Sequence, residues 1–301
     1  MDEELISSIQ QLDLGNKLGT STLVDVFREL RKSKLRRPDI VCQYGDEVLK
    51  VSSSEDTWNV REQMVNSLLD LGGTEELEAA RGHIKVLEKQ FPDSSRVEKL
   101  KGLAFEAEGQ FDKAQELYEV MLKKNHANLA VMKRMVACKK AMKNKVEAVK
   151  YLLSITTNFP GDLETWFELA DLYIEFRNFT QAAFCLEEII LIDPTKSHYH
   201  NKLADIYYTL GTPSKSSTSS SHQADVRKHL LLARKHYSLS LTLQNSKINR
   251  KAVYGVKYAS VALNPILIAS ASKDDETEIQ VNNKMLEWAE EQIKEESLSL
   301  Y

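Results

Sequence analysis

The sequence contains few of the residues that make turns. Its 301 residues include 11 glycines and 6 prolines, about half of the roughly 12% that these two residues contribute to ordinary soluble proteins. β-Sandwiches and β-barrels need turn residues every roughly 8–12 positions. The shortage therefore excludes such folds, and it favours long helices joined by short connections.

Cysteines are also scarce. The three thiols, Cys42, Cys138 and Cys185, are scattered, and no CxxC pair occurs. An odd and widely spaced set excludes a disulfide framework and a cysteine-rich zinc site, and it suits a reducing compartment. We expect all three cysteines to be small, buried apolar residues.

Long hydrophobic runs are missing. A membrane-spanning helix needs about 18 apolar residues or more, whereas the longest candidate, residues 261–271, is short and contains Asn264 and Pro265. The opening stretch MDEELISSIQ is acidic and lacks the basic start and apolar centre of a signal peptide. The sequence therefore predicts neither a transmembrane helix nor a signal peptide.

Motifs for catalysis and metal binding are absent from the sequence. It contains no GxGxxG, GxxxxGKS/T, HExxH or GxSxG pattern, so the phosphate-binding loops and catalytic turns that these patterns encode are missing. His198 and His200 stand two apart, which places them on different faces of a helix and does not suit a metal site. We expect no enzyme activity, no cofactor, no metal and no small-molecule substrate.

Charge is unevenly distributed, although the formal net charge is only −4. Residues 28–37 and 133–145 are basic, and residues 274–296 are acidic. Such blocks usually form solvated helix faces; the alternative is electrostatic docking of charged partners or lipid headgroups. RNA binding through residues 133–145 is a weaker alternative, because that block lacks interleaved aromatic residues. No nucleic-acid partner is expected.

A repeat of 34 residues dominates the sequence. An alanine followed four positions later by a large residue occurs in each copy, and a proline or histidine stands further on. The alanines are Ala80, Ala114, Ala148 and Ala182, and the later residues are Pro92, His126, Pro160 and Pro194. This period and pattern are typical of the tetratricopeptide repeat, a pair of antiparallel helices.

The copy at residues 163–194 fits the repeat best. Trp166, Leu169, Ala170 and Tyr173 match its first helix, and Ala182 matches its second. The alanines allow the two helices to approach closely, and large residues at helical spacing fill the space between them. A single pair cannot bury its apolar face, so neighbouring pairs must stack.

The register predicts an all-α fold, a right-handed superhelical solenoid of tetratricopeptide repeats with a C-terminal capping helix. First helices are expected to begin near Arg61, Ser95, Leu129, Leu163, Ser197 and Ile248, and the sixth copy contains Tyr254-Gly255-x2-Tyr258. The expected divisions are an N-terminal segment without order (1–20), N-terminal helices of a degenerate repeat (21–60), the repeat solenoid (61–271) with a flexible Ser-rich insertion (212–224), and an acidic capping helix (272–301).

The first helices of such a stack form most of its inner, concave surface, which is where solenoids bind partners. The candidates for partner binding at the inner positions are Lys99, Lys133, Lys140, Phe167, Asp171, Ile174, Asn201, Asp205 and Tyr208. Phe167 is either an exposed aromatic anchor or a residue packed on the neighbouring repeat. The Lys-and-Asn pair with which one subclass of these repeats grips acidic chaperone tails is absent, which weakens a chaperone-adaptor function.

The chain also resembles a particular family. The segments that carry the resemblance are FPGDLETWFELADLYIEFRNFTQAAFCLEEIILIDP (159–194), NKLADIYYTLG (201–211), YGVKYAS (254–260) and LEWAEEQI (286–293). They are similar to the family of ER membrane protein complex subunit 2.

The resemblance implies a non-catalytic cytosolic scaffold, associated peripherally with the cytosolic face of the ER membrane. The complex to which that family belongs inserts tail-anchored and polytopic membrane proteins into the ER. The implied partners are a soluble cytosolic subunit and the cytosolic parts of membrane subunits, so contact with the membrane would be indirect. A soluble adaptor for a chaperone or another cytosolic complex is the alternative.

Overall fold

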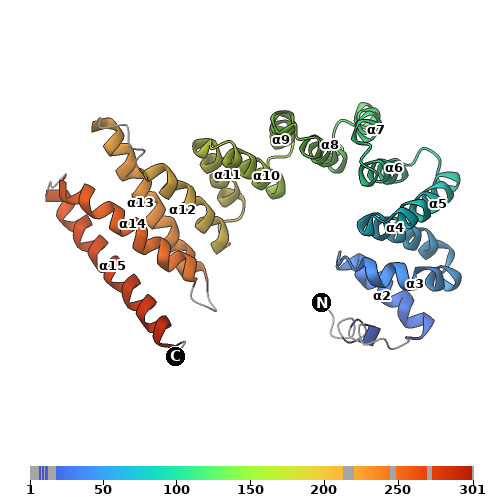
Figure 1. Cartoon of the computed structure of the whole chain (residues 1–301), viewed down its shortest axis with the longest axis horizontal. Coiled ribbons are helices and arrows are strands. Elements are labelled where there is room, and N and C mark those ends of the chain that lie inside the picture. The colour runs from blue at the N-terminus through green and yellow to red at the C-terminus, as the bar shows by residue number, and fades with distance from the viewer. Residues whose placement is uncertain are drawn as a thin grey trace. The chain divides into compact units, whose positions relative to one another are not determined.

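The structure is a computed structural model that describes residues 7, 9, 11, 12, 18–212, 220–244, 249–269 and 273–299. Its regular secondary structure in these ranges is entirely α-helical. The helices are α2 (Thr20–Lys32), α3 (Pro38–Val51), α4 (Ser54–Leu71), α5 (Thr74–Gln90), α6 (Ser95–Ala107), α7 (Phe111–Lys124), α8 (Leu129–Ala141), α9 (Lys145–Asn158), α10 (Leu163–Glu175), α11 (Phe179–Ile192), α12 (Ser197–Gly211), α13 (Ser220–Leu243), α14 (Arg250–Ala269) and α15 (Lys273–Ser299), labelled in Figure 1.

The chain divides into two compact units, residues 1–151 and residues 152–301, here called the N-terminal and the C-terminal unit. Within each unit, successive helices pack side by side (Figure 1), and first helices of adjacent repeats also touch, as α4 touches α6 and α12 touches α14. The boundary lies within α9 and inside the solenoid predicted for residues 61–271. Each repeat of a solenoid contacts only its neighbours, so contacts can divide in the middle of a regular array.

The predicted tetratricopeptide register is confirmed at the level of helices. α6, α8, α10 and α12 begin at the predicted first-helix starts. The four repeat alanines, Ala80, Ala114, Ala148 and Ala182, have no exposed surface, and the large residues four positions later, Ile84, Tyr118, Leu152 and Leu186, are also buried. The alanines therefore allow close helix approach, as the sequence predicts.

The turns inside the repeats also recur with the same period. Gly109, Lys143 and Arg177 stand 34 residues apart, and their φ angles are 74°, 61° and 57°. This left-handed conformation is favourable for glycine and costs other residues about 1 kcal/mol. The turn between paired helices thus has the same left-handed conformation in each of these repeats, even where the residue is not glycine.

The start of α4 differs from the prediction. The helix begins at Ser54 rather than near Arg61. Ser53 caps it, because its side-chain oxygen accepts a hydrogen bond from the backbone N–H of Asp56 (3.4 Å). Such a cap satisfies one of the amide groups that a helix start leaves unpaired.

The N-terminal segment 1–20, predicted to lack order, contains residues that are helical and packed. Ile9 and Leu12 are buried in a hydrophobic cluster with Leu23 and Phe27 of α2. Burial of these apolar side chains offsets the entropy lost on ordering the backbone around them. Ile9 and Leu12 are therefore packed, while residues 1–6, 8, 10 and 13–17, on which the prediction of partial disorder also falls, lie outside the described residues.

The Ser-rich insertion is shorter than the predicted range 212–224. Residues 220–224 already belong to α13, while residues 213–219 lie outside the described residues. α13 has 24 residues, against 14 in the second helix of the preceding repeat, α11. Part of the extra sequence therefore lengthens a helix. Ala233 and Tyr237 on that helix have the same spacing as Ala182 and Leu186 in the preceding repeat, and both are buried.

α14 runs without interruption through Asn264 and Pro265, the two residues that break the apolar run 261–271. Proline removes one helical hydrogen bond, here to the carbonyl of Val261. Both Val261 and Pro265 are exposed, so water can reach that carbonyl. α14 is long and apolar enough to span a membrane by length and composition, with a mean hydropathy of 1.3, but it packs against α13 and α15.

The sixth repeat copy departs from the pattern at its aromatic positions. Gly255 is buried where α14 meets α13, and an added Cβ would lie 2.5 Å from the ring of Tyr237. Tyr254 and Tyr258, however, are 41% and 55% exposed and stack on each other with ring centroids 6.5 Å apart. The glycine thus occupies the predicted close-approach position, whereas the two tyrosines face solvent.

A buried polar network fixes α15 to the preceding helices. The fully buried Asn282 donates from Nδ2 to the carbonyl oxygen of Ser260 (2.9 Å) and to Oδ1 of Asn264 (2.7 Å), both on α14. Its Oδ1 accepts a hydrogen bond from Nη1 of Arg234 on α13 (2.7 Å), and Arg234 also pairs with Glu278. One amide therefore joins α15 to both neighbouring helices.

Two histidines face each other between α12 and α13. Nε2 of His200 lies 3.1 Å from the carbonyl oxygen of Pro194, and its Nδ1 lies 3.0 Å from Nδ1 of His236. A carbonyl only accepts, so Nε2 of His200 donates this hydrogen bond. One repeat earlier, Trp166 makes the equivalent bond from Nε1 to the carbonyl oxygen of Pro160 (2.8 Å).

The stability of the fold is expected to fall below neutral pH because of His236. Burial, and then the nearby His200, lowers the pKa of His236 to about 4, whereas an unperturbed histidine titrates near about 6.5. Between these values the unfolded chain binds more protons than the folded protein. The contribution of His236 to the free energy of unfolding is therefore fully present above about pH 6.5, and it is lost progressively as the pH falls toward about 4.

Urea unfolding at about pH 7 and about pH 5 measures this effect. Because His236 is only half-buried, solvent screening limits the loss to about 1–2 kcal/mol. The variant His236→Gln is expected to lose less stability over the same interval than the wild type. An equal pH dependence in both proteins would contradict the assignment.

Candidate partner-binding surfaces

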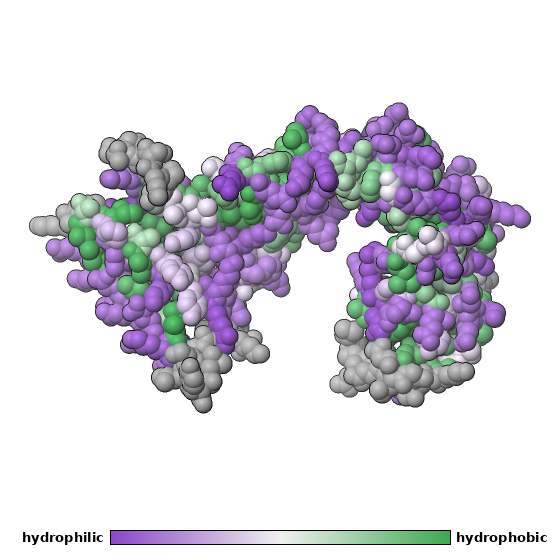
Figure 2. Space-filling model, in the orientation of Figure 1, coloured by the Kyte–Doolittle hydropathy of each residue, from purple (hydrophilic) through white to green (hydrophobic). Residues whose placement is uncertain are grey.

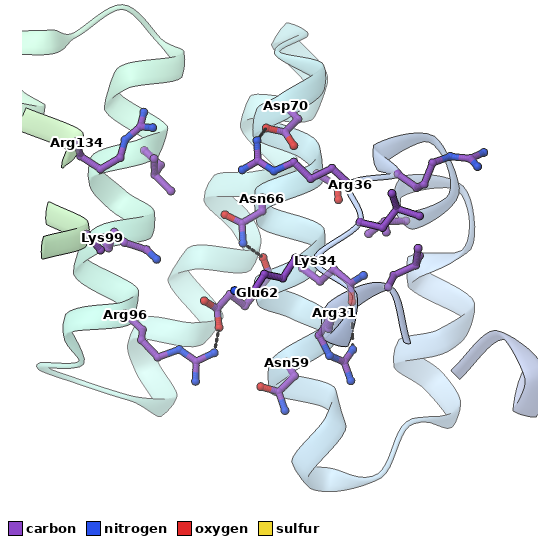
Figure 3. Close-up of a pocket in the computed structure, with 18 residues that line it drawn as sticks. Arg31, Lys34, Arg36, Asn59, Glu62, Asn66, Asp70, Arg96, Lys99 and Arg134 are labelled. Atoms are coloured by element: carbon purple, nitrogen blue, oxygen red, sulfur yellow. Dashed lines mark hydrogen bonds and ion pairs between the residues drawn. The ribbon is translucent and has the colours of Figure 1, made fainter. Parts of the chain in front are cut away.

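The N-terminal unit contains a cavity of about 480 Å³, here called the basic cavity. The connection between α2 and α3 forms one wall, and α4, α6 and the start of α8 form the others. Figure 3 shows Arg96 and Lys99 pointing from α6 toward α4, opposite Arg31, Lys34 and Arg36. The first helices of successive repeats thus contribute the same face of the molecule to this cavity, as expected for an inner surface.

Basic side chains outnumber acidic ones around the basic cavity. The acids that line it are Glu62 and Asp70. The bases that line it are Arg31, Lys34, Arg36, Arg37, Arg96, Lys99 and Arg134. The cavity therefore concentrates positive charge on a chain whose net charge is negative.

The arginines of the cavity are held by carboxylates. Arg96 pairs with Glu62, Arg36 with Asp70 and Arg134 with Glu106. Two further pairs are Arg31 with Asp56 (3.2 Å) and Arg37 with Asp39 (2.6 Å). Each guanidinium group therefore has a carboxylate beside it, and the side chains of Arg36 and Arg96 stay exposed.

The two lysines differ from the arginines. Among the described residues, the amines of Lys34 and Lys99 have no hydrogen-bond or ion-pair partner. Lys34 lies at the end of α2, where its φ angle of 55° turns the chain toward α3. Lys99 lies on the inner face of α6. The excess positive charge of the cavity therefore belongs to these two amines.

The rest of the lining is amide or apolar. Asn59, Gln63 and Asn66 contribute side-chain amides from one face of α4. Leu35 and Leu103 are among the apolar residues that complete the walls. The cavity can thus offer positive charge, amide hydrogen bonds and apolar contact to the same ligand.

Of the sequence candidates in the N-terminal unit, Lys99 lies in the cavity and two others lie beside it. Lys133 is half-buried and Lys140 is exposed on α8, but neither lines the cavity. Ala130 and Arg134 line it instead. Neighbouring positions on a helix point about 100° apart, so a register error of one residue exchanges one face for another.

Phe167 packs on the neighbouring repeat rather than standing free. Its ring lies 5.3 Å from that of Tyr199, and Nζ of Lys202 lies 4.5 Å from its centroid. The same lysine bonds Oδ1 of Asp171 at 2.5 Å. These contacts join α10 to α12, and Ile174 is half-buried on the same helix as Phe167.

The candidates on α12 are also engaged within the C-terminal unit. Asn201 is 7% exposed, which leaves its side chain little surface for a partner. Asp205 accepts a hydrogen bond from the hydroxyl of Tyr237 (2.7 Å) and pairs with Lys251 (2.5 Å). Tyr208 packs against a buried cluster of α13 and α14 side chains. These residues hold the repeats together.

Cys138 and Cys185 are buried as the sequence predicts, whereas Cys42 is only half-buried. Burial raises the pKa of the Cys138 and Cys185 thiols to about 12, so both are protonated at neutral pH. Among the described residues, no group of three side chains is arranged to hold a metal ion. The face shown in Figure 2 is mainly hydrophilic in both units, with hydrophobic side chains visible in narrow bands.

Sequence reasoning missed most of the cavity. The sequence predicts basic blocks at residues 28–37 and 133–145, the second of which contains Arg134, but it assigns neither block to a cavity and gives no signal for Arg96. The first block does supply Arg31, Lys34 and Arg36 to the lining. The positive charge of this block is evident from the sequence. Only the packing of α2 and α3 against α4 places that charge beside Lys99.

Known proteins resemble the chain over most of its length. A family model described as the EMC2 TPR-like repeat domain matches residues 84–222. The "ER membrane protein complex subunit 2" of Xenopus tropicalis is 34% identical over 275 residues, covering 90% of this chain and 84% of the relative. The protein of the same name from Dictyostelium discoideum is 30% identical over 174 residues, covering 56% of this chain and 53% of the relative.

Proposed function

This chain belongs to the family of ER membrane protein complex subunit 2, and on that premise we propose that it is a non-catalytic scaffold subunit of that complex. The observation that carries the proposal is the 34% identity across 84% of the length of the Xenopus tropicalis relative. The similarity extends over 90% of this chain, so it is not confined to one repeat. The chain is therefore proposed to assemble with other subunits of the same complex.

The proposed scaffold works on the cytosolic face of the ER membrane. Its stacked helix pairs supply an extended surface, and the basic cavity supplies a recessed site on that surface. Solenoids of this kind bind partners without catalysing reactions on them. We propose that this chain organises a soluble cytosolic subunit and the cytosolic parts of membrane subunits, so that the complex can insert tail-anchored and polytopic proteins.

Depletion of the chain from cells tests the insertion role. Insertion of a tail-anchored reporter into the ER is expected to fall, and re-expression of the full chain is expected to restore it. A secreted reporter with a cleavable signal peptide serves as the control. Unchanged insertion of tail-anchored and polytopic reporters after depletion would contradict the proposed function.

A further inference from the structure

We propose that the basic cavity of the N-terminal unit binds an extended acidic peptide segment of a partner subunit, with Lys34 and Lys99 pairing with its carboxylates. The proposal deepens the proposed function and rests on it in one respect, namely that the segment belongs to another subunit of the complex. Its physical basis is the charge, the shape and the mixed lining of the cavity.

The charge balance favours an anionic ligand. Each arginine of the lining already has a carboxylate partner, whereas the amines of Lys34 and Lys99 have none among the described residues. Two positive charges therefore remain, one on the half-buried Lys99 within the cavity and one on the exposed Lys34 at its edge, and a charged cleft focuses the electrostatic field on a ligand of opposite sign. A ligand with two or more carboxylates neutralises them.

The arrangement of the two amines favours an extended ligand over a single small ion. Lys34 enters from the α2–α3 connection and Lys99 from α6, on opposite sides of α4 (Figure 3). A peptide that crosses α4 can present separate carboxylates to the two amines. The arginine pairs between them keep the walls in place.

The lining between the lysines suits a polypeptide. Oε1 of Gln63 accepts a hydrogen bond from Arg31 (3.1 Å), and Nδ2 of Asn66 donates to the carbonyl oxygen of Glu62 (2.9 Å). Nε2 of Gln63 can still donate to a peptide backbone, and Oδ1 of Asn66 can accept from it. Leu35 and Leu103 provide apolar contact for the side chains that alternate with the acidic ones. An extended segment displays backbone groups and alternating side chains at the same time.

Two other anionic partners fit less well. A flat bilayer surface meets protruding basic residues, whereas Lys99 lies in a recess between α4 and α6. Single-stranded nucleic acid is usually bound by aromatic side chains on which bases stack, and the described residues that line the cavity include no aromatic ring. An acidic protein segment is therefore the partner that the cavity favours.

The test uses the purified full chain and a fluorescent peptide in which glutamate alternates with leucine, blocked at both ends. A peptide with glutamine in place of glutamate is the neutral control. Fluorescence polarisation is measured at about 50 mM and about 200 mM salt. The acidic peptide is expected to bind more tightly than its neutral counterpart, and its binding is expected to weaken at the higher salt concentration.

The double variant Lys34→Glu/Lys99→Glu is expected to weaken binding of the acidic peptide by at least about tenfold. The matched control Lys85→Glu/Lys113→Glu makes the same charge change at exposed positions of α5 and α7 outside the cavity, and it should bind like the wild type. Circular dichroism checks that both variants keep the helix content of the wild type.

Three results would overturn the proposal. They are equal affinity for the acidic and neutral peptides, equal loss of binding in the two double variants, and binding of anionic phosphatidylserine vesicles or oligouridine, but not the peptide, that depends on Lys34 and Lys99. None of these results bears on membership of the complex. A chain that still co-purifies with the other subunits but shows no preference for the acidic peptide refutes the cavity proposal alone.

Discussion

Replacing Gly102 with alanine is expected to destabilise the protein by about 1–3 kcal/mol, because the added methyl group overpacks the space between two helices. A Cβ at position 102 of α6 would lie 2.3 Å from the ring of Tyr118 on α7. Tyr118 has no exposed surface, and its hydroxyl donates a hydrogen bond to Oε1 of Glu106 (2.6 Å). The ring therefore cannot move aside without losing that bond.

Gly82 provides the matched control for this substitution. It lies within α5 and is exposed, and no atom lies within 4 Å of a Cβ added there. Gly82→Ala is expected to stabilise the protein by up to about 1 kcal/mol, because alanine favours the helix more than glycine does. Urea unfolding of both variants measures the difference, and two variants of equal stability would show that α6 and α7 do not approach closely at Gly102.

Replacing Asn282 with leucine is expected to cost about 2–4 kcal/mol and to loosen the C-terminal helix. The substitution leaves Arg234 without one of its two partners and removes the donor to Ser260 and Asn264. A buried polar group that loses its partner destabilises the folded state by more than the intact hydrogen bond stabilises it. Hydrogen exchange along α15 should become faster in Asn282→Leu even under conditions that favour the folded state.

Asn283 supplies the control for the capping network. It stands next to Asn282 on α15 but is exposed, so Asn283→Leu is expected to change stability by less than about 0.5 kcal/mol. If both leucine variants unfolded at the same urea concentration and exchanged amide hydrogens at the same rate, α15 would not depend on the buried network.

The sequence predicts the paired helices of the repeats correctly, because residues that recur every 34 positions define where each helix lies. Ala182 and its counterparts mark where helices meet, and a shift of one residue would expose them all. The irregular parts carry no such signal. The start of α4 depends on a cap at Ser53, and the continuation of α14 depends on the exposure of Pro265.

The candidate site was harder to predict than the fold. Residue types at inner positions predict partner binding by Lys99, which lines the basic cavity, and also by Phe167 and Asp205, which contact other repeats, and by Asn201, which is buried. Helical periodicity gives the direction of a side chain, and it does not tell whether a neighbouring repeat already fills the space. The contribution of Lys34 depends on packing between α2 and α4, to which the 34-residue pattern does not extend.

The most direct test of the scaffold function is affinity purification of the tagged full chain from detergent-solubilised ER membranes, followed by size-exclusion chromatography and cross-linking mass spectrometry. We expect the chain to elute in one large assembly with the other subunits of the ER membrane protein complex, cross-linked to a soluble subunit and to cytosolic parts of membrane subunits. Elution of the chain alone at its own mass, without those subunits, would contradict the account.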